Sequence, residues 1–202
     1  MGAYRLRRCL TVALSCIVVF ATTYANPVKM YKNTYNPVSD EEIRLLPEYL
    51  QVKVYYYLGV RPEAISNKVN EYLKKLGVPV YNPLHHYGLG LIYLRRARMQ
   101  AAYPVRRFDI DSAISEFTFV ITNSPSESFV LYDVYCKRGE AHMFANDLPN
   151  ATKDFRKSIE LKPDLQNAYL LLSECYTRIG DLKSADAIIE LGRTRSRQTN
   201  KQ

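Results

Sequence analysis

The second half of the chain repeats itself every 34 residues. Aligning residues 131–164 with residues 165–198 places similar residues opposite each other: Tyr135 with Tyr169, Gly139 with Ser173, His142 with Tyr176, Ala151 with Ala185, and Phe155 with Ile189. A fixed period of this length is typical of arrays in which one unit cannot bury its own apolar face, so that stacked neighbours supply the core. The period therefore predicts a row of similar units.

The spacing inside each unit is specific. The first unit has a large residue, a small residue four positions later, then Ala-x3-Phe and a closing proline; the second has arginine in place of that proline. An earlier copy is split by about eleven extra residues in a turn around Arg95–Arg107. This pattern resembles the tetratricopeptide repeat, a pair of antiparallel helices. The residues that carry it are Gly90, Ala113, Phe117, Pro125, Gly139, Ala151, Phe155, Pro163, Ser173, Tyr176 and Ala185.

The resemblance implies an all-α fold, a short right-handed α-solenoid of about three helix pairs over residues 84–198. The pairs are 84–130, 131–164 and 165–198. Three pairs are near the practical minimum for such a stack, so we expect residues 39–83 to cap its amino-terminal end. In this cap, Ser39 and Glu42 form a capping-box pattern, Pro47 is expected to separate a short helix from a longer one, and a helix over 64–76 ends at Gly77.

The amino terminus has the three parts of a secretory signal. Residues 1–8 are basic, residues 9–21 are apolar and uncharged, and small residues precede a cut after Ala25. Either a cleaved signal or an uncleaved anchor fits, and both predict an exported, periplasmic or envelope-associated protein. Removing these 25 residues and their three arginines from the 202-residue chain of net charge +8 leaves 177 residues of net charge +5. Residues 26–38 are expected to form an extended arm, and residues 199–202 a tail.

Catalytic and metal-binding signals are thin. The adjacent His85 and His86 would point about 100° apart on a helix, which is wrong for a shared metal, and His142 occupies a core position of the repeat. We therefore expect no catalytic residues, no metal and no cofactor. The 17 tyrosines fall largely at core positions, and the mild positive charge is not concentrated, so nucleic acid is not an expected partner. Cys136 and Cys175 are either two buried thiols or one disulfide.

The first helices of the repeats should line a concave face that, in this family, commonly holds a peptide. Related clamps for a terminal carboxylate use Lys, Asn and Arg there, whereas this chain has Glu140 and Glu174. An apolar segment flanked by Lys or Arg would suit such a groove better. Alternatively, the groove contacts the protein's own arm or long turn. By repeat position the groove residues are Tyr87, Leu91, Arg95, Asp133, Cys136, Glu140, Phe144, Leu170, Glu174 and Arg178.

The split copy also looks like exported proteobacterial tetratricopeptide proteins that have no assigned activity, which suggests a bacterial source. The sequence therefore predicts a non-catalytic scaffold of the cell envelope that binds a protein or peptide in its groove and helps to assemble or tether a complex. The alternative is a structural subunit held through a broad obligate interface outside the groove. Contact with a membrane is expected only through residues 1–25, if they remain uncleaved.

Overall fold

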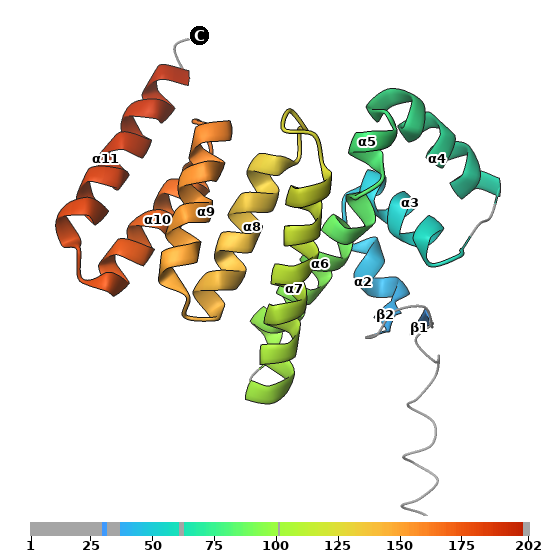
Figure 1. Cartoon of the computed structure of the whole chain (residues 1–202), viewed down its shortest axis with the longest axis horizontal. Helices are drawn as coiled ribbons and strands as arrows, with labels where there is room; N and C mark the ends of the chain where they lie inside the picture. Colours follow the sequence, from blue (N-terminus) through green and yellow to red (C-terminus); the bar gives the residue numbers. More distant parts are fainter. Residues whose placement is uncertain (1–29, 32–36, 61–62, 101, 200–202) are drawn as a thin grey trace, which may run out of the picture.

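Helices make up most of the described part of the computed structural model, which covers residues 30–31, 37–60, 63–100 and 102–199 (Figure 1). The helices are α2 (Asp40–Arg44), α3 (Glu48–Tyr57), α4 (Glu63–Leu76), α5 (Val78–Tyr81), α6 (Leu84–Met99), α7 (Tyr103–Asn123), α8 (Leu131–Phe144), α9 (Leu148–Leu161), α10 (Gln166–Ile179) and α11 (Leu182–Thr199). The predicted targeting segment and most of the arm and tail lie outside the described residues. Among the described residues, no helix is both long and apolar enough to cross a bilayer.

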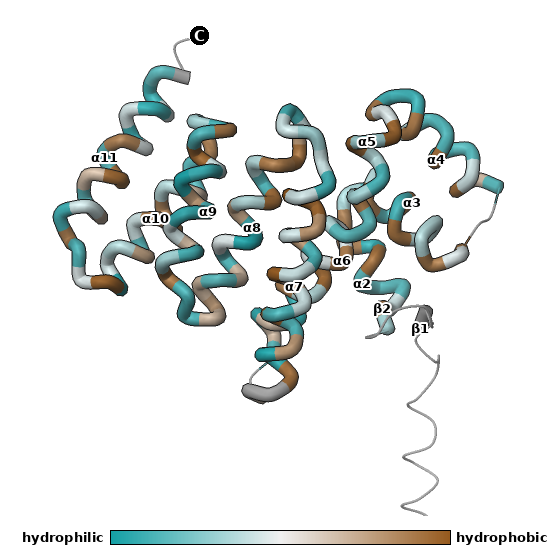
Figure 2. Tube along the Cα trace, viewed as in Figure 1, coloured by the Kyte–Doolittle hydropathy of each residue, from teal (hydrophilic) through white to brown (hydrophobic). Residues whose placement is uncertain are grey.

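Helices α6 to α11 form a row in which each helix packs on the next (Figure 1). The strongest packing is within the pairs α6–α7, α8–α9 and α10–α11, and apolar segments alternate with polar ones along the helices, as expected when one face of a helix is buried (Figure 2). The prediction of an all-α solenoid is confirmed.

Close approach of the two helices explains the small residues of each pair. A Cβ atom on Gly90 would lie 2.6 Å from the ring of Phe117, and one on Gly139 would lie 2.7 Å from the ring of Phe155. Both rings are fully buried. The third pair has Ser173 at this position, and its hydroxyl donates to the carbonyl oxygen of Ala185 at 3.0 Å. Small residues on the first helix therefore make room for large ones on the second.

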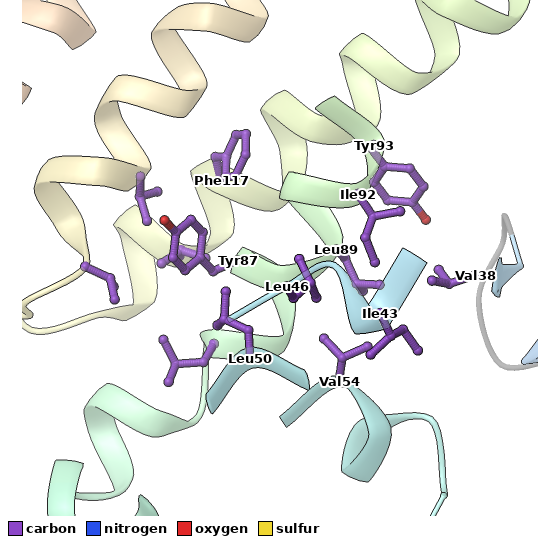
Figure 3. Close-up of a cluster of buried hydrophobic side chains, with 14 of the residues drawn as sticks. Val38, Ile43, Leu46, Leu50, Val54, Tyr87, Leu89, Ile92, Tyr93 and Phe117 are labelled. Atoms are coloured by element: carbon purple, nitrogen blue, oxygen red, sulfur yellow. The ribbon is translucent and has the colours of Figure 1, made fainter. Parts of the chain in front are cut away.

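The amino-terminal helices pack on the row through α3, which lies against α6. Gly88 permits this contact, because a Cβ atom there would lie 2.6 Å from Cγ2 of Val54. Figure 3 shows Leu46 and Leu50 toward Tyr87 of α6 and Val54 beside Ile43, all in one apolar cluster. The capping box of Ser39 and Glu42 is present, and Pro47 separates α2 from α3, as expected.

One expectation about an irregular segment is wrong. The extra residues around Arg95–Arg107 do not form a long turn, because α6 continues to Met99 and α7 begins at Tyr103, so the insertion lengthens both helices. Within the predicted extended arm, Met30–Tyr31 forms a short strand that pairs antiparallel with Val38–Ser39. The short helix α5, which follows Gly77 at a φ of 76°, is not among the predicted elements.

A stack of four rings joins α3, α6 and α7. The ring centroids of Tyr57 and His85 are 4.1 Å apart, those of His85 and His86 are 4.1 Å apart, and those of His86 and Phe119 are 3.7 Å apart. His86 also binds Glu116, with Nδ1 2.5 Å from Oε2. Burial, with smaller repulsion from His86 and Lys53, lowers the pKa of His85 to about 3. The His85 ring is therefore held neutral in the folded protein.

The neutral ring predicts a specific acid sensitivity. Between the unfolded pKa near 6.5 and the folded value, only the unfolded chain takes up a proton at His85, so stability falls as the pH falls. Between pH 7 and about pH 4.5, the free energy of unfolding of the parent protein should fall by about 1–2 kcal/mol more than that of His85→Gln. Urea titrations at both pH values measure this difference. Equal losses in the two proteins would contradict the inferred neutral ring.

Candidate partner-binding groove

A pocket of about 280 Å³ opens where the first helices of the three repeats meet. On α8, residues 140, 143 and 144 share a face because they are three and four positions apart; on α10, residues 171, 174 and 178 do so for the same reason. The carboxyl end of α6 completes the wall. The lining residues are Arg98, Glu140, Met143, Phe144, Leu171, Glu174 and Arg178, called the α6–α8–α10 groove below.

The charged side chains of the groove differ in whether they already have a partner within the protein. Glu140 forms ion pairs with Arg98 and with Lys137, whose Nζ lies 2.7 Å from Oε1, and only 8% of Glu140 is exposed. Arg178 donates to Oδ1 of Asn146 at 2.8 Å. Glu174 is exposed, and no ion pair to it is found in the described part of the chain. Glu174 is therefore the carboxylate that a guest can reach.

The apolar part of the groove comes from Met143, Phe144 and Leu171. Phe144 is 37% exposed, and the guanidinium carbon of Arg106 lies 5.3 Å from its ring centroid. The pocket volume lies just under the range of about 300–1,000 Å³ that is usual for small-molecule sites. An apolar floor beside one free carboxylate suits a side chain of a bound polypeptide.

Four of the ten predicted groove residues line this pocket, and the other six do not. Leu91 and Asp133 are half-buried, Arg95 lines a different pocket, and Leu170 is exposed outside the groove. Tyr87 and Cys136 were wrongly assigned to a ligand-accessible surface. Tyr87 is 3% exposed and donates its hydroxyl to Asp133, and Cys136 is 1% exposed because α10 covers it.

Three groove residues were missed: Arg98, Met143 and Leu171. Arg98 lies three positions after Arg95 on the same helix, a spacing that places both on neighbouring turns. The assumption of a long turn after Arg95 hid this signal, because Arg98 joins the groove only if α6 continues. Met143 and Leu171 each lie next to a residue that was assigned to the groove.

A second pocket, of about 500 Å³, lies at the amino-terminal end of the row. Pro37 of the arm and Arg95 line it, and Arg96 there binds Glu42 through two hydrogen bonds of 2.5 and 2.7 Å. Burial raises the pKa of Glu42, but the hydrogen bond and charge of Arg96, with the cap at Ser39, lower it on balance. The described end of the arm therefore lies at this second pocket and does not line the α6–α8–α10 groove.

Cys136, Cys175 and His142 lie within the packed repeats. Cys136 and Cys175 are both free and buried. Burial raises the pKa of Cys175 to about 11 and also raises that of Cys136, so neither is a thiolate at neutral pH. Burial lowers the pKa of His142, against the opposing charges of Asp154 and Asp147. These groups belong to the packing of the repeats.

Comparison with known proteins finds a repeat family in the same region. Residues 132–165, which span α8 and α9, match the model of the tetratricopeptide repeat. A segment of 84 residues is 31% identical to a protein of Oryza sativa subsp. japonica called Protein SGT1 homolog. This segment is 42% of the chain and covers 22% of that relative, so the similarity spans about a fifth of the relative's length.

Two solved structures have a similar arrangement of helices. MamA MSR-1 C2 has a TM-score of 0.49 at 15% identity, over 75% of this chain and 76% of that chain. A MamA point mutant has a TM-score of 0.47 at 16% identity, over 73% and 75% of the two chains. The family match falls on the helix pair in which Gly139 lies against Phe155, and the pairs on either side have the same construction. Residues 132–165 of this chain therefore carry a tetratricopeptide repeat.

Proposed function

We propose that this protein is a non-catalytic scaffold that binds a segment of another protein in the α6–α8–α10 groove. The observation that carries the proposal is the convergence of three apolar side chains and the unpaired Glu174 on one pocket between three successive repeats. Tetratricopeptide repeats suggest a protein-interaction role in general. The α6–α8–α10 groove is the surface that supports this proposal on the present chain.

The charges of the groove narrow the chemistry of the guest. Since Arg98 and Lys137 already neutralise Glu140, only Glu174 is free to pair with a basic residue. We expect a guest that places one apolar side chain against Met143 and Leu171 and one Lys or Arg beside Glu174. This is a narrower form of the apolar segment with basic flanks that the sequence predicts.

Selection from a displayed library of random short peptides tests this function. Peptides that bind should share an apolar residue close to Lys or Arg. Glu174→Lys should then raise the dissociation constant of the best peptide about five- to tenfold, because an attraction becomes a repulsion in a partly shielded pocket. Fluorescence anisotropy with the labelled peptide measures the change.

Glu71→Lys on α4 is the matched control. It makes the same charge reversal at an exposed glutamate far from the groove, and it should leave peptide affinity unchanged. Thermal unfolding of both variants should match the parent protein, since both positions are exposed. Library peptides without a common apolar–basic pattern, or equal weakening by both reversals, would disprove binding in this groove.

The second candidate is a structural subunit held through an obligate interface. The exposed Leu45, Met99 and Phe108 at the amino-terminal end of the row favour it, at 61%, 80% and 46% exposure. Such a subunit would aggregate when purified alone and would be insensitive to Glu174→Lys. A soluble protein with a groove-dependent peptide affinity would exclude it.

We also propose that the protein acts outside the cytosol, in the envelope of a bacterial cell. The support is the sequence pattern of residues 1–25, in which a basic start, an apolar middle and small residues follow one another. Amino-terminal sequencing of the protein from its host should find Asn26 first if the signal is cleaved. A cytosolic protein that retains Met1 would disprove export.

A further inference from the structure

The insertion in the first repeat brings a further arginine to the edge of the α6–α8–α10 groove. Arg106 lies near the start of α7, in the segment that makes this helix pair longer than the other two. Its guanidinium carbon lies 5.3 Å from the ring centroid of Phe144, which lines the groove. The lengthened helix pair therefore places a positive charge beside the apolar part of the groove.

The side chain of Arg106 has no acceptor within the protein. Of the residues that the structure describes, none forms an ion pair or a hydrogen bond with this side chain, and its Nε atom is buried. A buried N–H without an acceptor is unfavourable, and such groups are rare in folded proteins. The residue as a whole is half-buried, so a guest can reach it. A carboxylate of the guest would supply the acceptor, because a guanidinium can hold a carboxylate by two parallel hydrogen bonds.

The two other arginines of the groove already have acceptors. Arg98 forms an ion pair with Glu140. Arg178 donates to Oδ1 of Asn146 at 2.8 Å. Arg106 is therefore the arginine at this groove that is best suited to bind an acidic side chain of a guest.

The two unpaired charges of the groove come from helices on either side of α8. Helix α8 lies between α7, which carries Arg106, and α10, which carries Glu174 (Figure 1). Met143 and Phe144 stand at the carboxyl end of α8. We propose that the groove has a second charged subsite, at Arg106, and that its guest carries an acidic side chain there in addition to the basic one at Glu174. This inference rests on the proposed function, because it assigns a further part of the same groove.

The peptides selected on the parent protein test the second subsite. They should carry Asp or Glu as well as Lys or Arg around the shared apolar residue. For the best peptide, replacing its acidic residue by the corresponding amide and replacing Arg106 by glutamine should each raise the dissociation constant about three- to tenfold. Combining the two changes should cost little more than either alone, because both remove the same contact. Fluorescence anisotropy measures all four combinations.

Arg107→Gln is the matched control. Arg107 is the next residue of α7, but its Nε lies 2.9 Å from Oδ2 of Asp111 on the protein surface, so this variant should bind the peptide like the parent protein. Thermal unfolding of Arg106→Gln should also match the parent protein, since the arginine has no hydrogen-bond partner to lose. A clear loss of stability in Arg106→Gln would assign this arginine to packing on Phe144 and not to a guest.

Three results would overturn the second subsite. They are selected peptides without an acidic residue, equal effects of Arg106→Gln and Arg107→Gln, and an effect of the peptide amide that persists in full in Arg106→Gln. Failure of the proposed function gives a different result, because peptide affinity would then be insensitive to Glu174→Lys. Affinity that depends on Glu174 but not on Arg106 would remove the second subsite alone.

Discussion

Replacing Phe155 by alanine should lower the free energy of unfolding by about 3–5 kcal/mol. The ring is fully buried between α8 and α9, where it lies against the backbone of Gly139, so its removal leaves a cavity that the two helices cannot close without moving. Urea denaturation followed by circular dichroism measures the loss. Phe108→Ala is the control, since Phe108 is 46% exposed and should cost less than about 1 kcal/mol.

The contact between Gly139 and Phe155 predicts that the effect of Gly139→Ala on stability changes sign when the ring is removed. In the parent protein, Gly139→Ala places a Cβ atom 2.7 Å from the Phe155 ring and should destabilise by about 1–3 kcal/mol. Once Phe155 is alanine, the added methyl group enters the cavity and also improves helix propensity by up to about 1 kcal/mol. Gly139→Ala should then be neutral or stabilising. A loss of the same size in both backgrounds would show that the ring and the glycine do not constrain each other.

Replacing Arg138 by methionine should cost about 3–5 kcal/mol, because it leaves a buried carboxylate without its counter-ion. Arg138 binds Asp154 through two hydrogen bonds of 2.7 and 2.8 Å, and the Asp154 side chain is 3% exposed. His142 is the next basic group, with Nε2 3.9 Å from Oδ2 of Asp154. Urea denaturation at neutral pH measures the effect.

A double variant separates the effect of the two charges of Arg138 and Asp154 from the effect of the space that their side chains fill. Arg138→Met with Asp154→Leu replaces both charges by apolar groups, so it should recover most of the lost stability. Lys157→Met is the exposed control. Its partner Glu160 is 67% exposed, so loss of this pair should leave the free energy of unfolding close to that of the parent protein. A double variant as unstable as Arg138→Met alone would mean that the arginine acts through something other than the charge of Asp154.

The sequence predicts the helix pairs well because their packing depends on residue size at fixed positions. Gly139 and Phe155 are 16 positions apart within one unit, and their contact is repeated by Gly90 with Phe117. Such contacts lie within one repeat, so the period reveals them. The capping box at Ser39 is equally local. The length of an insertion, by contrast, does not say whether it forms a loop or extends the helices on either side of it.

The groove is harder to predict, because the exposure of a groove position depends on the next repeat. Cys136 occupies a position that would face a ligand, yet Asn167 covers it from 31 residues away. Glu140 has the expected place, but Arg98, 42 residues earlier, neutralises it. The 34-residue pattern does not predict either contact. Arg98, for example, belongs to the lengthened helix α6, which has no counterpart in the other repeats.

Helix α8 belongs to two apolar clusters. Val134 and Ala141 face the amino-terminal cluster, whereas Cys136 and Met143 face the carboxy-terminal one. The row thus has two hydrophobic cores, and α8 contributes side chains to both of them. Cooperative unfolding must pass through this helix, while α11, supported from one side, opens most readily. Amide protons should accordingly exchange with solvent slowly in α8 and rapidly in α11, as a gradient along the molecule.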